Sequence, residues 1–76
     1  MCIGIPMQIV TREGQEAVAE TGGVRRRLSL ALLDEPLGPG DWVLVHVGYA
    51  IARVEEEEAR ETLDLLRAVA EAADRA

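Results

Sequence analysis

The sequence predicts a mainly β protein in which four or five short strands precede one C-terminal α-helix. Three observations support this prediction. Segments that are rich in β-branched residues or alternate in polarity recur over the first 54 residues, glycine and proline cluster between them, and the apolar period lengthens to that of a helix from Glu55 onward. A chain of 76 residues is long enough for one domain. We therefore expect a single domain over residues 1–76, with a barrel at about 3–54 and the helix at about 55–74.

The predicted strands lie at residues 3–13, 15–20, 24–33, 42–47 and 49–54. Pro6 places the start of the first strand at a sheet edge or in an irregular segment, because proline cannot donate to a ladder. Two prolines and two glycines within residues 34–41 predict a loop. Gly48 is expected to bend the chain between the last two strands. In the fourth strand, alternation predicts one shared face for Val43, Val45 and Val47.

The helix is predicted from an apolar stripe made of Ala59, Leu63, Leu66, Val69 or Ala70, and Ala73. Four glutamates, Glu55–Glu58, begin this segment, and their negative charge suits the positive end of a helix dipole. A meandering sheet this small must curl to hide its edges. We therefore expect an OB-like β-barrel with one C-terminal helix.

The composition excludes several classes of function. The chain carries a net charge of -6 and only two aromatic residues, which argues against binding nucleic acid, since that needs a basic face and usually stacking aromatics. No run of about 18 apolar residues exists to span a membrane. The N-terminus also lacks the basic and apolar regions of a signal peptide. One unpaired cysteine and no export signal together predict a cytoplasmic protein.

Two residues could carry chemistry, namely Cys2 and His46, the only cysteine and the only histidine. The initiator methionine is usually removed before a small residue, which would place a free amine beside the Cys2 thiol and favour the nucleophilic thiolate. The alternative is that Cys2 has no chemical role and is only a small residue at a frayed chain end. A lone histidine in a strand is more often a packed, hydrogen-bonded residue than a ligand. Thiolate and imidazole are nevertheless good metal ligands. Because two ligands do not complete a site, the others would come from a partner or from small molecules.

Two stretches, MCIGIPMQIV at the N-terminus and GDWVLVHVGYAIARVEEEEARETLDLL at 40–66, resemble the HypC/HupF family of hydrogenase maturation chaperones. The family opens with Met-Cys-hydrophobic-(Gly/Ala)-hydrophobic-Pro, which Cys2, Gly4 and Pro6 match. Its second signature is Gly-Asp-aromatic-Val-hydrophobic-Val-His-Val-Gly-aromatic-Ala, and an acidic helix containing Glu-Thr-Leu follows it. The matching residues are Gly40, Asp41, Trp42, Val43, Val45, His46, Val47, Gly48, Tyr49, Ala50, Glu61, Thr62 and Leu63.

This resemblance implies the same OB-like fold and a chaperone rather than an enzyme. It implies binding to HypD while the Fe(CN)2CO unit of [NiFe]-hydrogenase is assembled, followed by delivery of that unit to the precursor of the hydrogenase large subunit. The family's N-terminal cysteine and its histidine map to Cys2 and His46, which would hold iron together with the partner. Iron with its CN and CO ligands would be transient and shared with HypD, and none would be tightly bound to the isolated chain.

Three other functions remain as alternatives at this point. Met7, where the family often has glycine or another small residue, and the short tail leave open a dedicated paralogue that protects or chaperones one hydrogenase large subunit. An enzyme with Cys2 as nucleophile and its own amine or His46 as base is a second alternative, although no oxyanion hole or substrate pocket is evident. A generic OB-type binder of nucleic acid is the third, and the acidic charge argues against it.

Overall fold

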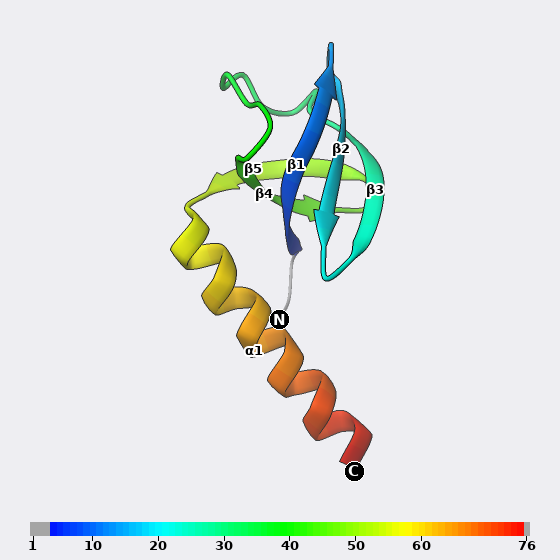
Figure 1. Cartoon of the computed structure of the whole chain (residues 1–76), viewed down its shortest axis with the longest axis vertical. Helices are drawn as coiled ribbons and strands as arrows, with labels where there is room; N and C mark the ends of the chain where they lie inside the picture. The colour runs from blue at the N-terminus through cyan, green and yellow to red at the C-terminus, as the bar shows by residue number, and fades with distance from the viewer. Residues whose placement is uncertain (1–3, 76) are drawn as a thin grey trace.

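The computed structural model describes residues 4–75, and the side chains of residues 4–72. Cys2, and the side chain of Ala73 in the predicted helical stripe, lie outside this described part. The elements follow the expected order (Figure 1): β1 (Ile5–Glu13), β2 (Glu16–Thr21), β3 (Val24–Ser29), β4 (Trp42–His46), β5 (Tyr49–Val54) and α1 (Glu56–Arg75). The prediction of a mainly β protein with one C-terminal helix is confirmed.

The strands form a closed barrel in the order β1-β2-β3-β5-β4. Neighbouring strands are antiparallel except β3 and β5, which meet in parallel where Ser29 lies opposite Tyr49. The strand β1 lies between two partners. It pairs with β4 over Ile5–Gln8, and with β2 from Gln8 onward. Closure removes the sheet edges that so short a chain could not otherwise cover, and the predicted OB-like barrel is confirmed.

Tight turns connect three pairs of adjacent strands. Two residues separate β1 from β2, β2 from β3, and β4 from β5, and the turns are Gly14–Gln15, Gly22–Gly23 and Val47–Gly48. The first residue of each turn has a positive φ, as the favoured two-residue hairpin turns require. The first two turns lie at the short gaps between the predicted strands, and the predicted bend at Gly48 is the β4–β5 turn.

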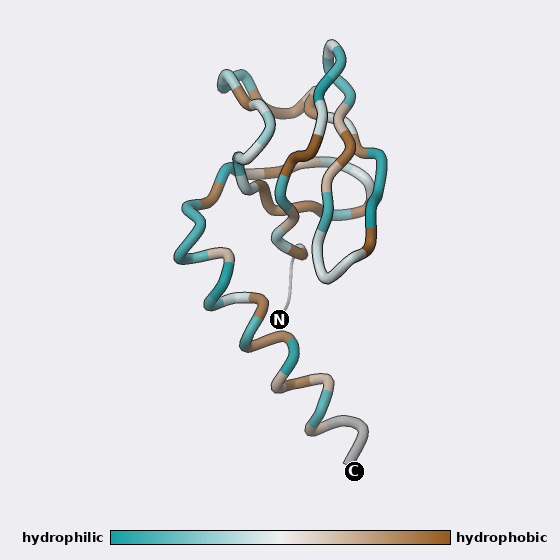
Figure 2. Tube along the Cα trace, viewed as in Figure 1, coloured by the Kyte–Doolittle hydropathy of each residue, from teal (hydrophilic) through white to brown (hydrophobic). Residues whose placement is uncertain are grey.

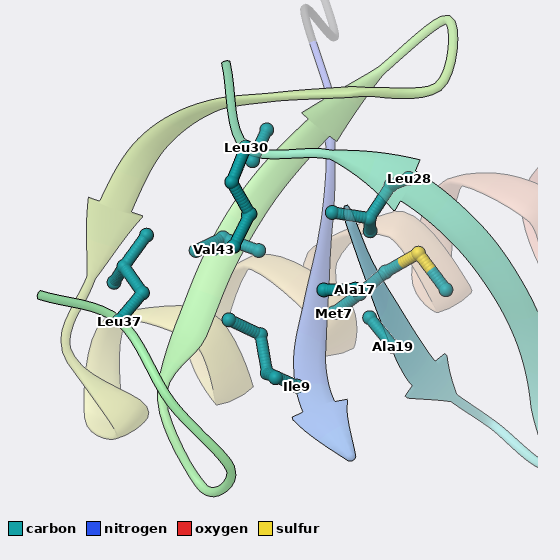
Figure 3. Packing of buried hydrophobic residues seen from close by; sticks show 9 residues of the cluster. Met7, Ile9, Ala17, Ala19, Leu28, Leu30, Leu37 and Val43 are labelled. Atoms are coloured by element: carbon teal, nitrogen blue, oxygen red, sulfur yellow. The ribbon is translucent and has the colours of Figure 1, made fainter. Parts of the chain in front are cut away.

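The core lies inside the barrel, where side chains from β1, β2, β3 and β4 meet (Figure 3). Its largest fully buried side chains include Ile9, Leu30 and Val43, each at most 2% exposed. Leu37 reaches the same cluster from the loop before β4. The remaining members are small or flexible: Met7, Ala17, Ala19, Leu28 and Ala50. Small residues on β2 suit the narrow interior of a five-stranded barrel, because larger side chains there would overfill it.

The prediction that the third strand continues to Leu33 is wrong, because β3 ends at Ser29. Local bonds take the place of the ladder there. The Ala31 backbone N–H donates to Ser29 Oγ at 3.1 Å, and the Leu33 N–H donates to the Leu30 carbonyl at 3.1 Å. In a continuing strand Leu30 and Leu32 would share one face, whereas in this turn the first is buried and the second is exposed. Side-chain competition for backbone groups ended the strand.

The predicted common face of Val43, Val45 and Val47 is also wrong at its last member. Val43 is fully buried and Val45 is partly buried, whereas Val47 is 82% exposed. An irregularity in the β4–β5 register between Leu44 and Val45 disturbs the alternation, and β4 ends at His46 before Val47 is reached. A two-residue period holds only while the strand continues.

The helix α1 packs one half against the barrel and projects with the other (Figure 1). It contacts β1 and β4, and Ala59 is only 1% exposed. Leu63 and Leu66 are partly buried, but Leu65 and Val69 are 64% and 59% exposed. Figure 2 shows that hydrophobic residues continue along the projecting part. Among the described side chains, the predicted stripe is therefore used for packing over about the first half of the helix. No helix among the described residues has the length and apolar content to cross a membrane.

Truncation of Leu30 tests the position of the core. We expect Leu30→Ala to lower the free energy of unfolding by about 2–5 kcal/mol, because it removes a buried side chain and leaves a cavity. Leu32→Ala is the matched control: it is the same change two residues away on an exposed side chain, and it should stay within about 0.5 kcal/mol of the parent. Urea unfolding followed by circular dichroism gives both values. Equal losses in the two variants would contradict the burial described.

Candidate partner-binding site

His46 is the last residue of β4, and its side chain is exposed at one end of the barrel. It lies opposite Tyr49 in the β4–β5 ladder, across the Val47–Gly48 turn. Among the residues that the structure describes, none forms a hydrogen bond or ion pair with its imidazole. A packed, hydrogen-bonded histidine, which we considered the more frequent case, is therefore not what the described residues form. The imidazole can bind a partner or a ligand without first losing an interaction within that part of the chain.

Gly4 brings the start of the chain to this same end. In the β1–β4 ladder Ile5 lies opposite Val45, so one further step of the register places Gly4 opposite His46. A Cβ added at Gly4 would lie 3.0 Å from the Leu44 Cγ and 3.0 Å from the Val45 carbonyl oxygen. The absence of a side chain is what allows this close approach. Gly4 thus has a packing role in the N-terminal motif.

Pro6 has a structural role as well. It is among the largest fully buried side chains and lies opposite Leu44. The pairing of β1 with β2 begins only at Gln8, so Pro6 lies where one edge of β1 has no neighbouring strand. This position agrees with the expected edge location, and the fixed φ of proline limits the freedom of the segment that leads to Cys2.

The residues at the start of the second signature hold the loop before β4 against β1. The Gly40 N–H donates to the Ile9 carbonyl at 2.9 Å, and the Ile9 N–H donates to the Asp41 carbonyl at 2.8 Å. The Asp41 side chain accepts a bond from the Gly38 N–H at 2.9 Å, and Gly40 has a φ of 96°. These bonds position the start of β4, and therefore the far end of the same strand where His46 lies.

The signature residues therefore fall into two groups. Those with buried side chains, Val43 and Ala50, belong to the core, and Gly40 and Asp41 order the loop. Three exposed side chains of the signature lie around the β4–β5 turn: His46, Val47 and Tyr49. Sequence reasoning singled out His46 but treated Val47 as a strand residue. Its place directly before a glycine was the available signal for a turn.

A pocket of the barrel does not coincide with the end where His46 lies. An open pocket of about 210 Å³ lies along β1, β2 and β3, and its lining residues are Thr11, Glu13, Glu16, Ala17, Val18 and Arg27. In the part of the chain that the structure describes, no three His, Cys, Asp or Glu side chains gather as a metal site would require. His46 is thus a single potential ligand among the described residues, and Cys2 lies outside them.

The fold and this site define a small β-barrel with an exposed histidine beside the start of its first strand. The chain belongs to the HupF/HypC family, whose model matches residues 1–66. It is 47% identical to "Hydrogenase maturation factor HypC" of Helicobacter hepaticus, over 86% of this chain and 77% of the relative. The proteins of the same name are 47% identical in Escherichia coli K12 (88% and 80% of the two chains) and 44% identical in Azotobacter chroococcum (97% and 88%).

Substitution of Gly4 tests the close approach of β1 to β4. We expect Gly4→Ala to lower the free energy of unfolding by about 1–3 kcal/mol, because the new methyl group meets a backbone oxygen that cannot move without disturbing the ladder. Gly38→Ala is the matched control, since nothing lies within 4 Å of its Cβ position and its φ is not positive. It should be neutral or slightly stabilising. Chemical denaturation distinguishes the two, and a neutral Gly4→Ala would contradict the contact.

Proposed function

We propose that this protein is a chaperone of [NiFe]-hydrogenase maturation. In this role it binds HypD while the Fe(CN)2CO unit is assembled and then delivers that unit to the precursor of the large subunit. Membership of the HupF/HypC family supports the class of function, because relatives that match most of the chain are named hydrogenase maturation factors. The observation that carries the proposal is the β1–β4 register, which brings the start of β1 to the exposed His46.

Gly4 follows the β1–β4 register to His46, and Cys2 is two residues before Gly4 in the sequence. This register supports a shared role for the Cys2 thiolate and the His46 imidazole, which one partner would then bind together. Removal of the initiator methionine would add a free amine next to the thiol and make Cys2 the reactive tip of the chain.

The shortage of ligands in the described part of the chain favours a shared site. Cys2 and His46 supply at most two ligands to iron, whereas tetrahedral or octahedral coordination needs four or six. Thiolates of HypD and the CN and CO ligands would fill the other positions. Iron would then be cargo that is held jointly and released when the two proteins separate. His46 is not among the described residues that line the pocket on β1, β2 and β3, and no specific observation favours an enzyme that uses Cys2 as nucleophile.

Replacement of the thiol is the first test. We expect Cys2→Ala to lose co-purification with HypD and to lose hydrogenase maturation in cells. Its thermal unfolding should remain that of the parent, because the change lies before the first strand. Glu13→Ala, an exposed change at the opposite end of β1, is the control and should bind and mature normally. Normal maturation by Cys2→Ala would refute the proposed role of the thiol.

Replacement of the imidazole separates binding of HypD from holding of iron. We expect His46→Ala to stay within about 0.5 kcal/mol of the parent in stability, since its side chain is exposed and without a described partner. The variant should purify with HypD, but the CN and CO stretching bands in the infrared spectrum of the complex should be weakened or shifted. If the bands and the delivery to the large subunit were unchanged, His46 would have no role in holding iron.

A further inference from the structure

The turn between β4 and β5 contains a valine in a conformation that valine rarely adopts. Val47 has a φ of 51° and Gly48 a φ of 83°, values that fit a type I′ turn, in which both central residues are left-handed. Asparagine, aspartate or glycine usually occupies the first position of such a turn. A β-branched residue with positive φ is a genuine outlier, because its Cβ is crowded by the neighbouring backbone. Val47 is the non-glycine residue with a positive φ among the described residues.

A second turn in the same chain shows what the fold itself requires. The β2–β3 turn has nearly the same backbone, with a φ of 55° at Gly22 and 83° at Gly23. There the first position is glycine, which adopts this conformation at no steric cost. The β1–β2 turn likewise begins with a glycine, Gly14, at a φ of 63°. The geometry of the β4–β5 turn therefore does not need valine, and neither does the orientation of His46 that depends on it.

Packing within the described chain does not offset this strain. Val47 is 82% exposed, so its side chain removes little apolar surface from water. Two further large apolar side chains are exposed close to it along the ladders: Ile5 at 48%, opposite Val45, and Tyr49 at 47%, opposite His46. Val47 is thus an apolar side chain held out from a short, stiff turn, next to His46 in the sequence and at the end of the barrel where β1 begins.

We propose that Val47 is a contact residue for the partner protein that receives Cys2 and His46, and that its side chain fills an apolar pocket on that protein. The proposal rests on the function proposed above and adds a residue that determines binding. Backbone strain that packing within the folded chain does not offset is a recurring feature of binding sites. A side chain fixed by a two-residue turn also loses little conformational entropy on binding. A second copy of this chain fits less well as the occupant, because each copy carries a net charge of -6.

The test changes the first residue of each of the two matched turns, Val47 in one and Gly22 in the other. Val47→Asn supplies the residue that type I′ turns favour and removes the branched side chain, so the midpoint of thermal unfolding should rise by about 4–8 °C. Affinity for HypD, measured by calorimetric titration, should fall about tenfold or more. Gly22→Val places the same strain in the β2–β3 turn, where no atom lies within 4 Å of the new Cβ. It should lower the midpoint and leave the affinity unchanged.

Val47→Ile keeps a branched apolar side chain and should retain both the affinity and the unfolding midpoint of the parent. Unchanged affinity in Val47→Asn, together with loss of binding in Cys2→Ala, would overturn this inference and leave the proposed function intact. An unchanged midpoint in Val47→Asn would overturn it as well, because the strain would be absent. A concentration-dependent dimer in sedimentation that Val47→Asn abolishes would assign the side chain to a second copy instead. Normal binding by Cys2→Ala would count against the proposed function itself.

Discussion

The pairing of β1 with β4 is the interaction on which the rest of the structure depends. These strands are far apart in the sequence, and their ladder closes the barrel. The same ladder brings Gly4 against Leu44 and Val45, and so places the start of β1 at the end of β4 where His46 lies. The fold and the candidate site therefore have one cause. A shift of the register by one residue would reverse the faces of β4 and separate the two ends.

Most of the fold could be predicted because its signals are local. Strand periodicity, glycine at turns and the acidic start of a helix are each read from a few neighbouring residues, and the barrel followed from the small number of strands. The wrong predictions concern strand ends, where a local hydrogen bond or a turn ended the strand although the alternating pattern of residues continued. After Ser29, side-chain and turn bonds replaced the ladder although the leucines still alternated. After His46, a tight turn began one residue before the glycine that predicted it.

The site was less predictable, because it depends on contacts between distant parts of the chain. The chemistry of Cys2 and His46 can be recognised from residue type, but no local pattern contains the β1–β4 register that brings Gly4 to the end of β4 where His46 lies. The exposure of His46 could not be predicted from the sequence either, since an alternating strand can hold either a packed or an exposed imidazole. The strain at Val47 could not be inferred at all while the residue was taken as part of a strand, because it exists only in the left-handed turn.

Placement of the exposed signature residues on a stiff barrel also bears on how cargo could be passed on. Gly40, Asp41, Val43 and Ala50 have their side chains or backbones engaged in the fold, whereas His46, Val47 and Tyr49 are exposed, so a contact made by these three side chains need not disturb the core or the loop. Under the proposed function, a chain that offers only two ligands holds iron through a partner and loses it when a second protein supplies more. Incomplete coordination by this chain is then what makes the metal unit transferable, whereas a complete site would retain it.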